Sequence, residues 1–145
     1  MRTMKVQKLR NVKTPSRGTE QSAGIDFFVP EDFETRELQP GESALIPSGI
    51  KAHVPNGYAL IAFNKSGVSV KQGLSVGACV VDEDYEGEIH LHLINTSNKP
   101  QIITTGQKLT QFVLIPVAYI DVEEVEELPD RSTTRGTGGF GSTGL

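Results

Sequence analysis

The stretch that decides the fold is residues 77–90, GACVVDEDYEGEIH. An apolar run over 78–81 precedes an acidic segment over 82–87, and a strict alternation of polar and apolar residues follows over 88–93. Alternation with a period of two is typical of a half-buried strand. The stretch is therefore predicted to be a β-hairpin whose acidic tip offers backbone groups, a carboxylate and an aromatic ring to one small ligand.

Length and composition point to one globular domain with a core of ordinary size, because the chain has 145 residues, 22% of them charged and 37% apolar. The net charge of −4 argues against a broad nucleic-acid surface, so we expect no nucleic-acid partner. A single cysteine, Cys79, excludes an intrachain disulfide and fits a reducing compartment.

The sequence carries neither a signal-peptide pattern nor an apolar segment approaching 18 residues. We therefore expect no membrane partner. We also expect a protein that is not secreted and is cytoplasmic, or lies in the nucleus or host cytoplasm if the source is viral.

The fold class is predicted to be all-β, because 15 glycines and 8 prolines separate many short apolar runs. Residues 10–22 and 30–43 read as loops, and at most one short helix is allowed, at 68–70. Residues 1–128 then form one β domain, and 129–145 form a flexible, glycine-rich C-terminal arm. Strands are expected over 4–9, 22–28, 44–47, 50–54, 58–63 (buried on both faces), 101–104, 109–117 and 119–128.

Asp82 is the candidate catalytic carboxylate of the acidic segment. Four carboxylates within 82–86 usually make a solvated turn, but Asp82 directly follows the apolar residues 79–81. We expect this position to be partly desolvated, so that the carboxylate holds a water molecule and accepts its proton. A calcium loop is rejected because its closing glutamate would fall at Leu93.

The C-terminal arm contains a second candidate site. Residues 136–141 fit the G-x-G-x-x-G pattern, but only four residues follow, and a dinucleotide fold needs a helix there. Glycine N–H groups can wrap phosphate oxygens, Arg135 can fork onto a terminal phosphate and Phe140 can stack on a base. The ordinary alternative is a disordered tail, for which a lone phenylalanine among glycines is an odd choice.

Three further signals are weak alone. Lys65-Ser66-Gly67 ends an apolar strand and could clamp phosphate, although such a Ser-Gly is usually just a turn. Asp26 inside an apolar strand must be paired, either with a structural partner or with a cation-bearing site. Gln111, in the longest apolar run, likewise needs hydrogen-bond partners if it is buried.

His90 and His92 have a spacing that can bind zinc. No third ligand is obvious nearby, so contact with solvent or with another subunit is favoured over a metal site.

In this order, the segments resemble the five motifs of the homotrimeric dUTPase (deoxyuridine 5'-triphosphate nucleotidohydrolase) family. The third and fifth are highly specific, and together the five span nearly the whole chain. The resemblance implies a jelly-roll-type β-barrel and a homotrimer whose three active sites each draw residues from all three subunits. The matching segments are 23–27, 65–68, 77–88, 106–111 and 135–143.

The implied reaction is hydrolysis of dUTP to dUMP and pyrophosphate, which keeps uracil out of DNA and supplies dUMP for dTMP synthesis. By this resemblance Asp82 activates the water that attacks the α-phosphorus. The implied cofactor is Mg²⁺, held mainly by the triphosphate, with Asp26 acting on it through water.

The resemblance also assigns the base and sugar contacts. Tyr85 would pack under the deoxyribose and exclude a ribose 2′-hydroxyl. Backbone groups around 79–82 and near His90 would read the uracil edge, and Phe140 would cover the base.

The phosphate contacts follow in the same way. Ser66 and Gly67 would hold the phosphate chain, Gln111 would act through water and Arg135 would meet the γ-phosphate. The complete set of implied substrate-binding residues is Lys65, Ser66, Gly67, Cys79, Val80, Val81, Tyr85, His90, Gln111, Arg135, Phe140, Gly141 and Ser142.

The chain departs from the family pattern at four places. Lys65 stands where arginine is usual and loses the planar fork. Cys79 replaces a glycine, Glu86 replaces an arginine, and Gln107-Lys108 replaces an Asp-Arg pair.

Two other functions compete with the hydrolase. One is a nucleotide-binding regulatory protein on the same scaffold, against which the intact Asp82 argues. The other is the related dCTP deaminase, against which the arm at 135–143 counts.

Overall fold

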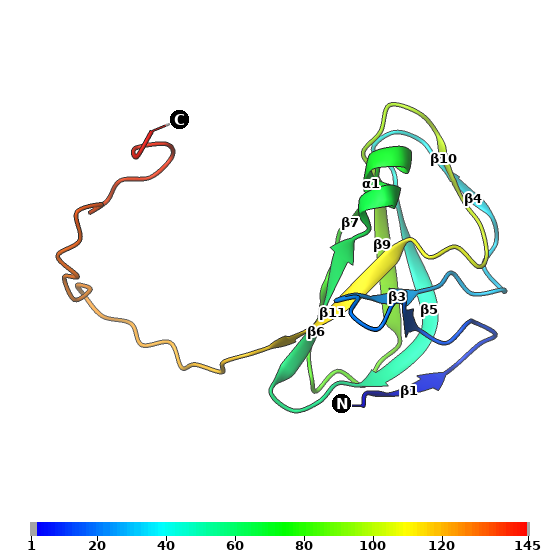
Figure 1. Cartoon of the computed structure of the whole chain (residues 1–145), viewed down its shortest axis with the longest axis horizontal. Helices are drawn as coiled ribbons and strands as arrows, with labels where there is room; N and C mark the ends of the chain where they lie inside the picture. The colour runs from blue at the N-terminus through cyan, green and yellow to red at the C-terminus, as the bar shows by residue number, and fades with distance from the viewer. Residues whose placement is uncertain (1–2, 145) are drawn as a thin grey trace.

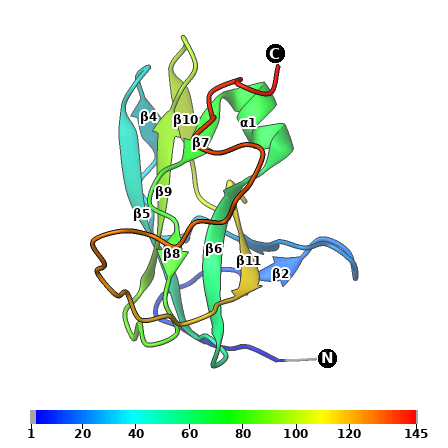
Figure 2. The ribbon, with the colours of Figure 1, turned by 90° about the vertical axis from the view of Figure 1, so that its left-hand side faces the viewer.

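The strands of the chain form two facing layers, seen edge-on in Figure 2, in the computed structural model, which describes residues 3–144. One layer is a four-stranded antiparallel sheet in the order β1-β5-β9-β7. The other is a five-stranded antiparallel sheet in the order β2-β3-β11-β6-β8, and β10 and β4 form a separate ribbon. Residues 1, 2 and 145 of the predicted domain bounds lie outside the described part.

The elements are short, as Figure 1 shows. They are β1 (Lys5–Lys8), β2 (Ser16–Arg17), β3 (Ile25–Phe27), β4 (Arg36–Leu38), β5 (Ser43–His53), β6 (Tyr58–Asn64), α1 (Ser66–Gln72), β7 (Leu74–Val76), β8 (Val80–Val81), β9 (Ile89–Asn95), β10 (Gln101–Ile103) and β11 (Thr110–Pro116).

The core lies between the two layers and is built from alternating residues of their strands. In β9, Ile89, Leu91 and Leu93 are buried, as their spacing of two predicts. From the opposite layer, the rings of Phe27 and Phe112 pack with centroids 4.5 Å apart.

The predicted fold class is confirmed, because the chain is mostly β with one short helix. The strands expected over 4–9, 22–28, 58–63, 101–104 and 109–117 correspond to β1, β3, β6, β10 and β11, and α1 includes the predicted helix. No helix within residues 3–144 is long and apolar enough to cross a membrane. Burial of β6 on both faces is wrong, because Phe63 on its outer face is 43% exposed.

The two strands expected over 44–47 and 50–54 are one strand, β5, with an irregularity in its middle. Its register against β9 jumps from Pro47↔His90 to Ile50↔Ile89. The intervening Gly49 has φ +75°, a left-handed conformation that glycine adopts without steric cost. The irregularity lies within the part of β5 that pairs with β9, and β1 pairs with β5 beyond it, over residues 50–53.

The predicted hairpin over 77–90 is wrong in its pairing. β8 pairs with β6, through Leu60↔Val81, and so belongs to the five-stranded sheet. β9 pairs with β5 and β7 in the other layer. Because Val81 is buried in the second layer, the chain crosses from one sheet to the other after β7 and returns at β9. We call residues 77–88 the crossing loop.

The strand expected over 119–128 does not form. Its apolar residues lie among acids, but the segment has no pairing partner within residues 3–144, and its large apolar side chains are exposed. Conversely, β2 and β4 lie inside segments read as loops. Both residues of β2 and two of the three in β4 are exposed, so neither strand has an alternating pattern to detect.

Asn95, at the end of β9, is fully buried and uses its whole amide. Its nitrogen donates to the carbonyls of Leu38 at 2.9 Å and Lys99 at 2.8 Å. Its oxygen accepts from the N–H and hydroxyl of Ser97 at 3.0 and 2.7 Å. This one side chain ties β9 to β4 and to the turn that follows β9.

We expect Asn95→Ala to lower the free energy of unfolding by about 1–3 kcal/mol, because the buried Leu38 carbonyl loses its donor. Urea denaturation at fixed protein concentration measures the change. Asn98→Ala, in the same turn but exposed, is the matched control, and an equal loss in both variants would contradict the assignment.

Candidate active site

The crossing loop and β9 enclose a small cavity of about 160 Å³. The cavity exists because β8 joins the far sheet while β9 stays in the near one. Its lining includes core residues such as Phe112 and the outer residue Leu45. Five predicted substrate-binding residues also line it: Cys79, Val80, Val81, Tyr85 and His90.

Tyr85 is held in a fixed position at this cavity. Its hydroxyl donates to the carbonyl of Glu88 at 2.8 Å. A Cβ atom at Gly87 would overlap the tyrosine ring, so the ring fits only because residue 87 is glycine. The ring therefore forms a rigid, half-exposed wall.

Cys79 contributes to the lining of the cavity. Its carbonyl accepts from the Ala62 N–H at 2.8 Å, so this backbone oxygen is already used within the fold. Its side chain is partly buried against the hydrophobic core.

Asp82 follows the buried Val81 but is itself exposed. The expected partial desolvation of this carboxylate is therefore wrong for the single chain, because the strand ends at Val81 and the next residue already faces solvent. With Glu83, Asp84 and Tyr119, Asp82 lines a cleft of about 280 Å³. Slight desolvation of the Tyr119 hydroxyl, its hydrogen bond with Glu83 and the nearby carboxylates raise the pKa of Tyr119.

A second group of predicted residues surrounds Asp26, which is 6% exposed. One of its carboxylate oxygens pairs with the Lys65 ammonium and the other lies 3.7 Å from that of Lys108. Gln111 is opposite Asp26 in the β3–β11 register and donates to the Asn64 carbonyl at 2.8 Å. Of the two readings left open for Asp26, the single chain has the structural partner.

Ser66 and Gly67 begin α1 beside this group and are exposed. The preceding Lys65 has extended backbone dihedrals, and its side chain turns back to Asp26 rather than capping the helix. The hydroxyl of Ser66 and the N–H of Gly67 therefore face solvent next to a paired lysine.

The arm forms a third group, away from the two layers (Figure 1). The Nε of Arg135 donates to the Gly138 carbonyl at 2.8 Å. Phe140 is fully exposed, with φ +50°, and Gly141 and Ser142 continue in local turns. Among residues 3–144, no hydrogen bond or ion pair directly joins the arm, the Asp26 group and the cavity.

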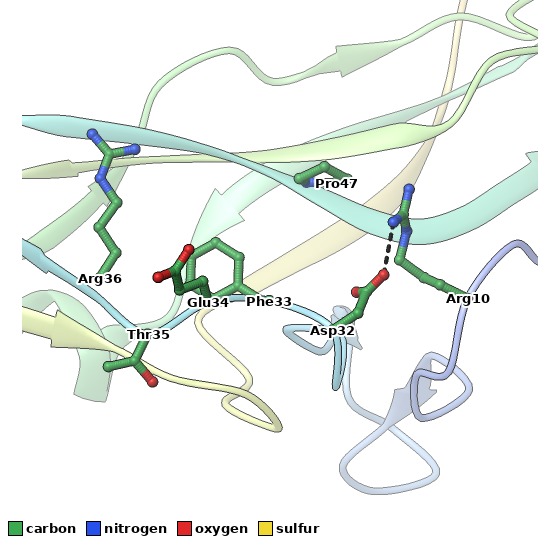
Figure 3. Close-up of a pocket in the computed structure, with 7 residues that line it drawn as sticks. All are labelled: Arg10, Asp32, Phe33, Glu34, Thr35, Arg36 and Pro47. Atoms are coloured by element: carbon green, nitrogen blue, oxygen red, sulfur yellow. Dashed lines mark hydrogen bonds and ion pairs between the residues drawn. The ribbon is translucent and has the colours of Figure 1, made fainter.

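Glu88 fixes the end of the crossing loop, a role that the sequence did not reveal. Its carboxylate, 15% exposed, accepts from Arg10 Nε at 3.0 Å and Nη2 at 2.8 Å. It also accepts from the Gly49 N–H at 2.7 Å, in the irregular part of β5. Figure 3 shows the further ion pair between Arg10 and Asp32, 2.9 Å long.

These contacts shift the pKa values of both Glu88 and Arg10. The Arg10 guanidinium holds the pKa of the Glu88 carboxyl below its ordinary value, and the Gly49 N–H adds to this against the opposing effect of burial. In turn, hydrogen bonds to Glu88 and Asp32 raise the pKa of Arg10. Arg10 and Glu88 lie 78 residues apart, and no local pattern could have linked them.

The sequence as a whole matches one known family. A profile described as dUTPase matches residues 10–144. The chain belongs to the dUTPase family. It is 40% identical over 145 residues to a deoxyuridine 5'-triphosphate nucleotidohydrolase of Gloeothece citriformis, covering 98% of this chain and 97% of that one.

Solved dUTPase structures share the fold. A dUTPase variant of Staphylococcus bacteriophage 80alpha with dUpNHpp superposes with a TM-score of 0.86 at 26% identity, covering all of both chains. A dUTPase variant of the S. aureus phage phi11 has a TM-score of 0.79 at 26% identity, covering 89% of this chain and 100% of that one. That structure describes the coordination of a structural Mg(II) ion.

We expect Glu88→Gln to lower the free energy of unfolding by about 1–2 kcal/mol at pH 7, because a charged hydrogen-bond acceptor is lost. A depressed folded-state pKa stabilises the fold above the unfolded value, about pH 4.3, and this contribution disappears as the pH falls through the folded value. The difference from wild type should therefore shrink between pH 5 and pH 3. Urea denaturation across this range tests it.

The exposed neighbour Glu86 provides the control. Glu86→Gln should match wild type throughout. A Glu88→Gln deficit that stays constant with pH would mean that the carboxylate charge is irrelevant to the contact.

Proposed function

We propose that this dUTPase hydrolyses dUTP to dUMP and pyrophosphate, with Asp82 activating the attacking water. The observation that carries the proposal is the cavity between the crossing loop and β9, with Asp82 in the loop that lines it. At about 160 Å³ it is smaller than the roughly 300–1,000 Å³ of typical ligand pockets. It therefore suits the base, leaving the sugar and phosphates outside.

The fixed ring of Tyr85 supports the sugar selectivity. Its hydroxyl is bonded to the Glu88 carbonyl and its ring packs against Gly87, so the ring is held at the cavity. A deoxyribose packs against such a wall, whereas a ribose 2′-hydroxyl would have to be buried without a partner, which is costly.

We assign Asp82 to proton transfer rather than to binding. An exposed carboxylate next to the base cavity can accept the proton of a water that attacks the α-phosphorus in line with the leaving pyrophosphate. Ordering of the arm over the bound nucleotide would exclude bulk water and hold this geometry.

Phosphate contacts are proposed for Ser66, Gly67 and Arg135, with Lys65 and Gln111 in support. The exposed Ser66 hydroxyl and Gly67 N–H are free to bind anionic oxygens. Lys65 is paired with Asp26 in the single chain, so its contact with phosphate requires the ammonium to be shared between the two.

The Mg²⁺ ion is proposed to arrive with the substrate. Within residues 3–144 no three His, Cys, Asp or Glu side chains are grouped to hold a metal. Both oxygens of Asp26 face lysine ammonium groups, so this carboxylate does not fit a metal held by the protein alone. Bound to the triphosphate, Mg²⁺ would neutralise part of its charge, and Asp26 would reach it through water.

A homotrimer with shared sites is proposed from the exposed apolar surface. Tyr119, Ile120, Val122 and Leu128 are exposed on the segment that follows β11. On the outer face of the five-stranded sheet, Phe63 and Val80 are exposed too. Exposed apolar side chains in such numbers are typical of association sites, and an arm that does not contact its own cavity is free to reach another subunit's.

The test of the reaction is pyrophosphate release with Mg²⁺ from dUTP, dCTP, dTTP and UTP in parallel. Release from dUTP alone is expected. Asp82→Asn should retain dUTP binding and lose at least about a hundredfold in kcat, the scale of general-base catalysis. Asp84→Asn, two residues along, is the control and should hydrolyse dUTP. Undiminished hydrolysis by Asp82→Asn would show that another group is the base.

Removal of residues 129–145 should lower kcat for dUTP strongly while leaving the melting temperature unchanged, because the arm makes no direct contact with the site groups in the barrel. Phe140→Ala should weaken dUTP binding roughly fivefold to 150-fold, the cost of one lost base stack. Both are measured by steady-state kinetics and thermal denaturation.

Mixing the arm-deleted chain with the Asp82→Asn chain tests whether the arm acts on its own subunit or on a neighbouring one. If arms reach neighbouring subunits, mixed trimers regain hydrolysis, since an intact Asp82 then meets an intact arm. No recovery after confirmed subunit exchange would mean that each arm serves its own chain.

A further inference from the structure

We propose that His92 is a positioning residue for the base cavity: its neutral imidazole holds the Ala78 backbone, so that protonation of the ring weakens dUTP binding. The inference rests on one part of the proposed function, namely that the cavity binds the base of dUTP. His92 itself does not line that cavity.

The contact fixes the protonation state of the ring. The backbone N–H of Ala78 lies 2.9 Å from His92 Nδ1. A backbone N–H can only donate, so Nδ1 must be the acceptor, and the ring must be neutral with its proton on Nε2. A protonated imidazole carries a hydrogen on both nitrogens and cannot accept here.

The ring occupies space that only a glycine leaves open. The N–H of Gly77 donates to the His92 carbonyl at 3.0 Å, which brings the two backbones together. A Cβ atom at Gly77 would overlap the imidazole ring itself. Glycine at 77 and histidine at 92 therefore form one packed unit at the point where the crossing loop leaves β7.

This unit anchors one end of the segment that lines the cavity. Ala78, Cys79, Val80 and Val81 all contribute to the lining. The segment is held at Ala78 by His92 of the near sheet and at Cys79 by the Ala62 N–H of the far sheet. Loss of the first contact frees the near end and leaves the far end in place.

Few groups around His92 could offset a positive charge. On its own strand, His90 is on the same face, and Glu88 is already held by Arg10 and Gly49. On β5 the residue opposite is Leu45, and the guanidinium of Arg36 reaches the Ser43 carbonyl two positions along.

The remaining side is formed by β7 and the start of the crossing loop. Residues 74–78 carry no titratable side chain, and the nearest one beyond them is the Cys79 thiol. The contact is therefore present while the imidazole is neutral. It is lost when the ring takes up a proton, because both ring nitrogens then carry a hydrogen.

The kinetic test compares KM and kcat for dUTP with Mg²⁺ at pH 7.5 and pH 5.5. His92→Asn keeps an acceptor near the position of Nδ1 but does not titrate, and His92→Leu removes the acceptor. The rise in KM between the two pH values should be about threefold to tenfold larger for wild type than for His92→Asn, with equal changes in kcat. His92→Leu should show a high KM at both pH values.

His53, exposed at the end of β5, supplies the matched control. His53→Asn should follow wild type at both pH values. Gly77→Ala, which displaces the ring, should raise KM as His92→Leu does. Equal KM ratios in wild type and His92→Asn would overturn the proposal.

A second measurement does not depend on activity. The amide NMR signal of Ala78 should shift between pH 7.5 and pH 5.5 in wild type and stay fixed in His92→Asn. The same shift in both proteins would overturn the inference and leave dUTP hydrolysis untouched. Conversely, failure of wild type to bind dUTP at pH 7.5 would remove the proposed function, while the Ala78 response would remain.

Discussion

The arrangement of the site depends on the passage of the backbone from one sheet to the other and back between β7 and β9. Those two strands pair with each other, yet the residues between them add β8 to the opposite sheet. Backbone groups that leave a ladder need new partners. Here they are supplied one at a time, by His92 for Gly77 and Ala78, by Ala62 for Cys79 and by Tyr85 for Glu88. The cavity is the space that this detour leaves open.

A buried carboxylate plays the corresponding part for the second group of predicted site residues. Burying the charge of Asp26 would be prohibitive without partners, and two lysines from distant segments supply them. The pairing fixes β3 relative to the end of β6 and the turn before β11. It also keeps the start of α1, with its exposed hydroxyl and N–H groups, next to positive charge.

Residue patterns predicted the strands that depend on neighbouring residues, but they failed where the structure depends on a partner distant in the sequence. The alternation of β9 and the apolar run of β6 were sufficient to place both strands. The apolar residues among the acids of 119–128 predicted a strand that does not form, because the segment finds no pairing partner among residues 3–144. The hairpin was wrong for a related reason: β8 pairs with β6, a strand distant in the sequence, and Val81 is buried there. The Arg10–Glu88 contact, 78 residues apart, has no sequence signature at all.

The interlocking of Gly77 with the His92 ring has an evolutionary consequence. While an imidazole stands at 92, any side chain at 77 overlaps it, so a substitution at 77 displaces the ring and is disfavoured. A smaller residue at 92 would open position 77, and a later return to histidine would then be blocked. The effect of a substitution at position 77 therefore depends on the residue at position 92, and the two substitutions can occur only in a particular order. That order, rather than the chemistry of either residue alone, determines which descendants can carry an ionisable group behind the base cavity.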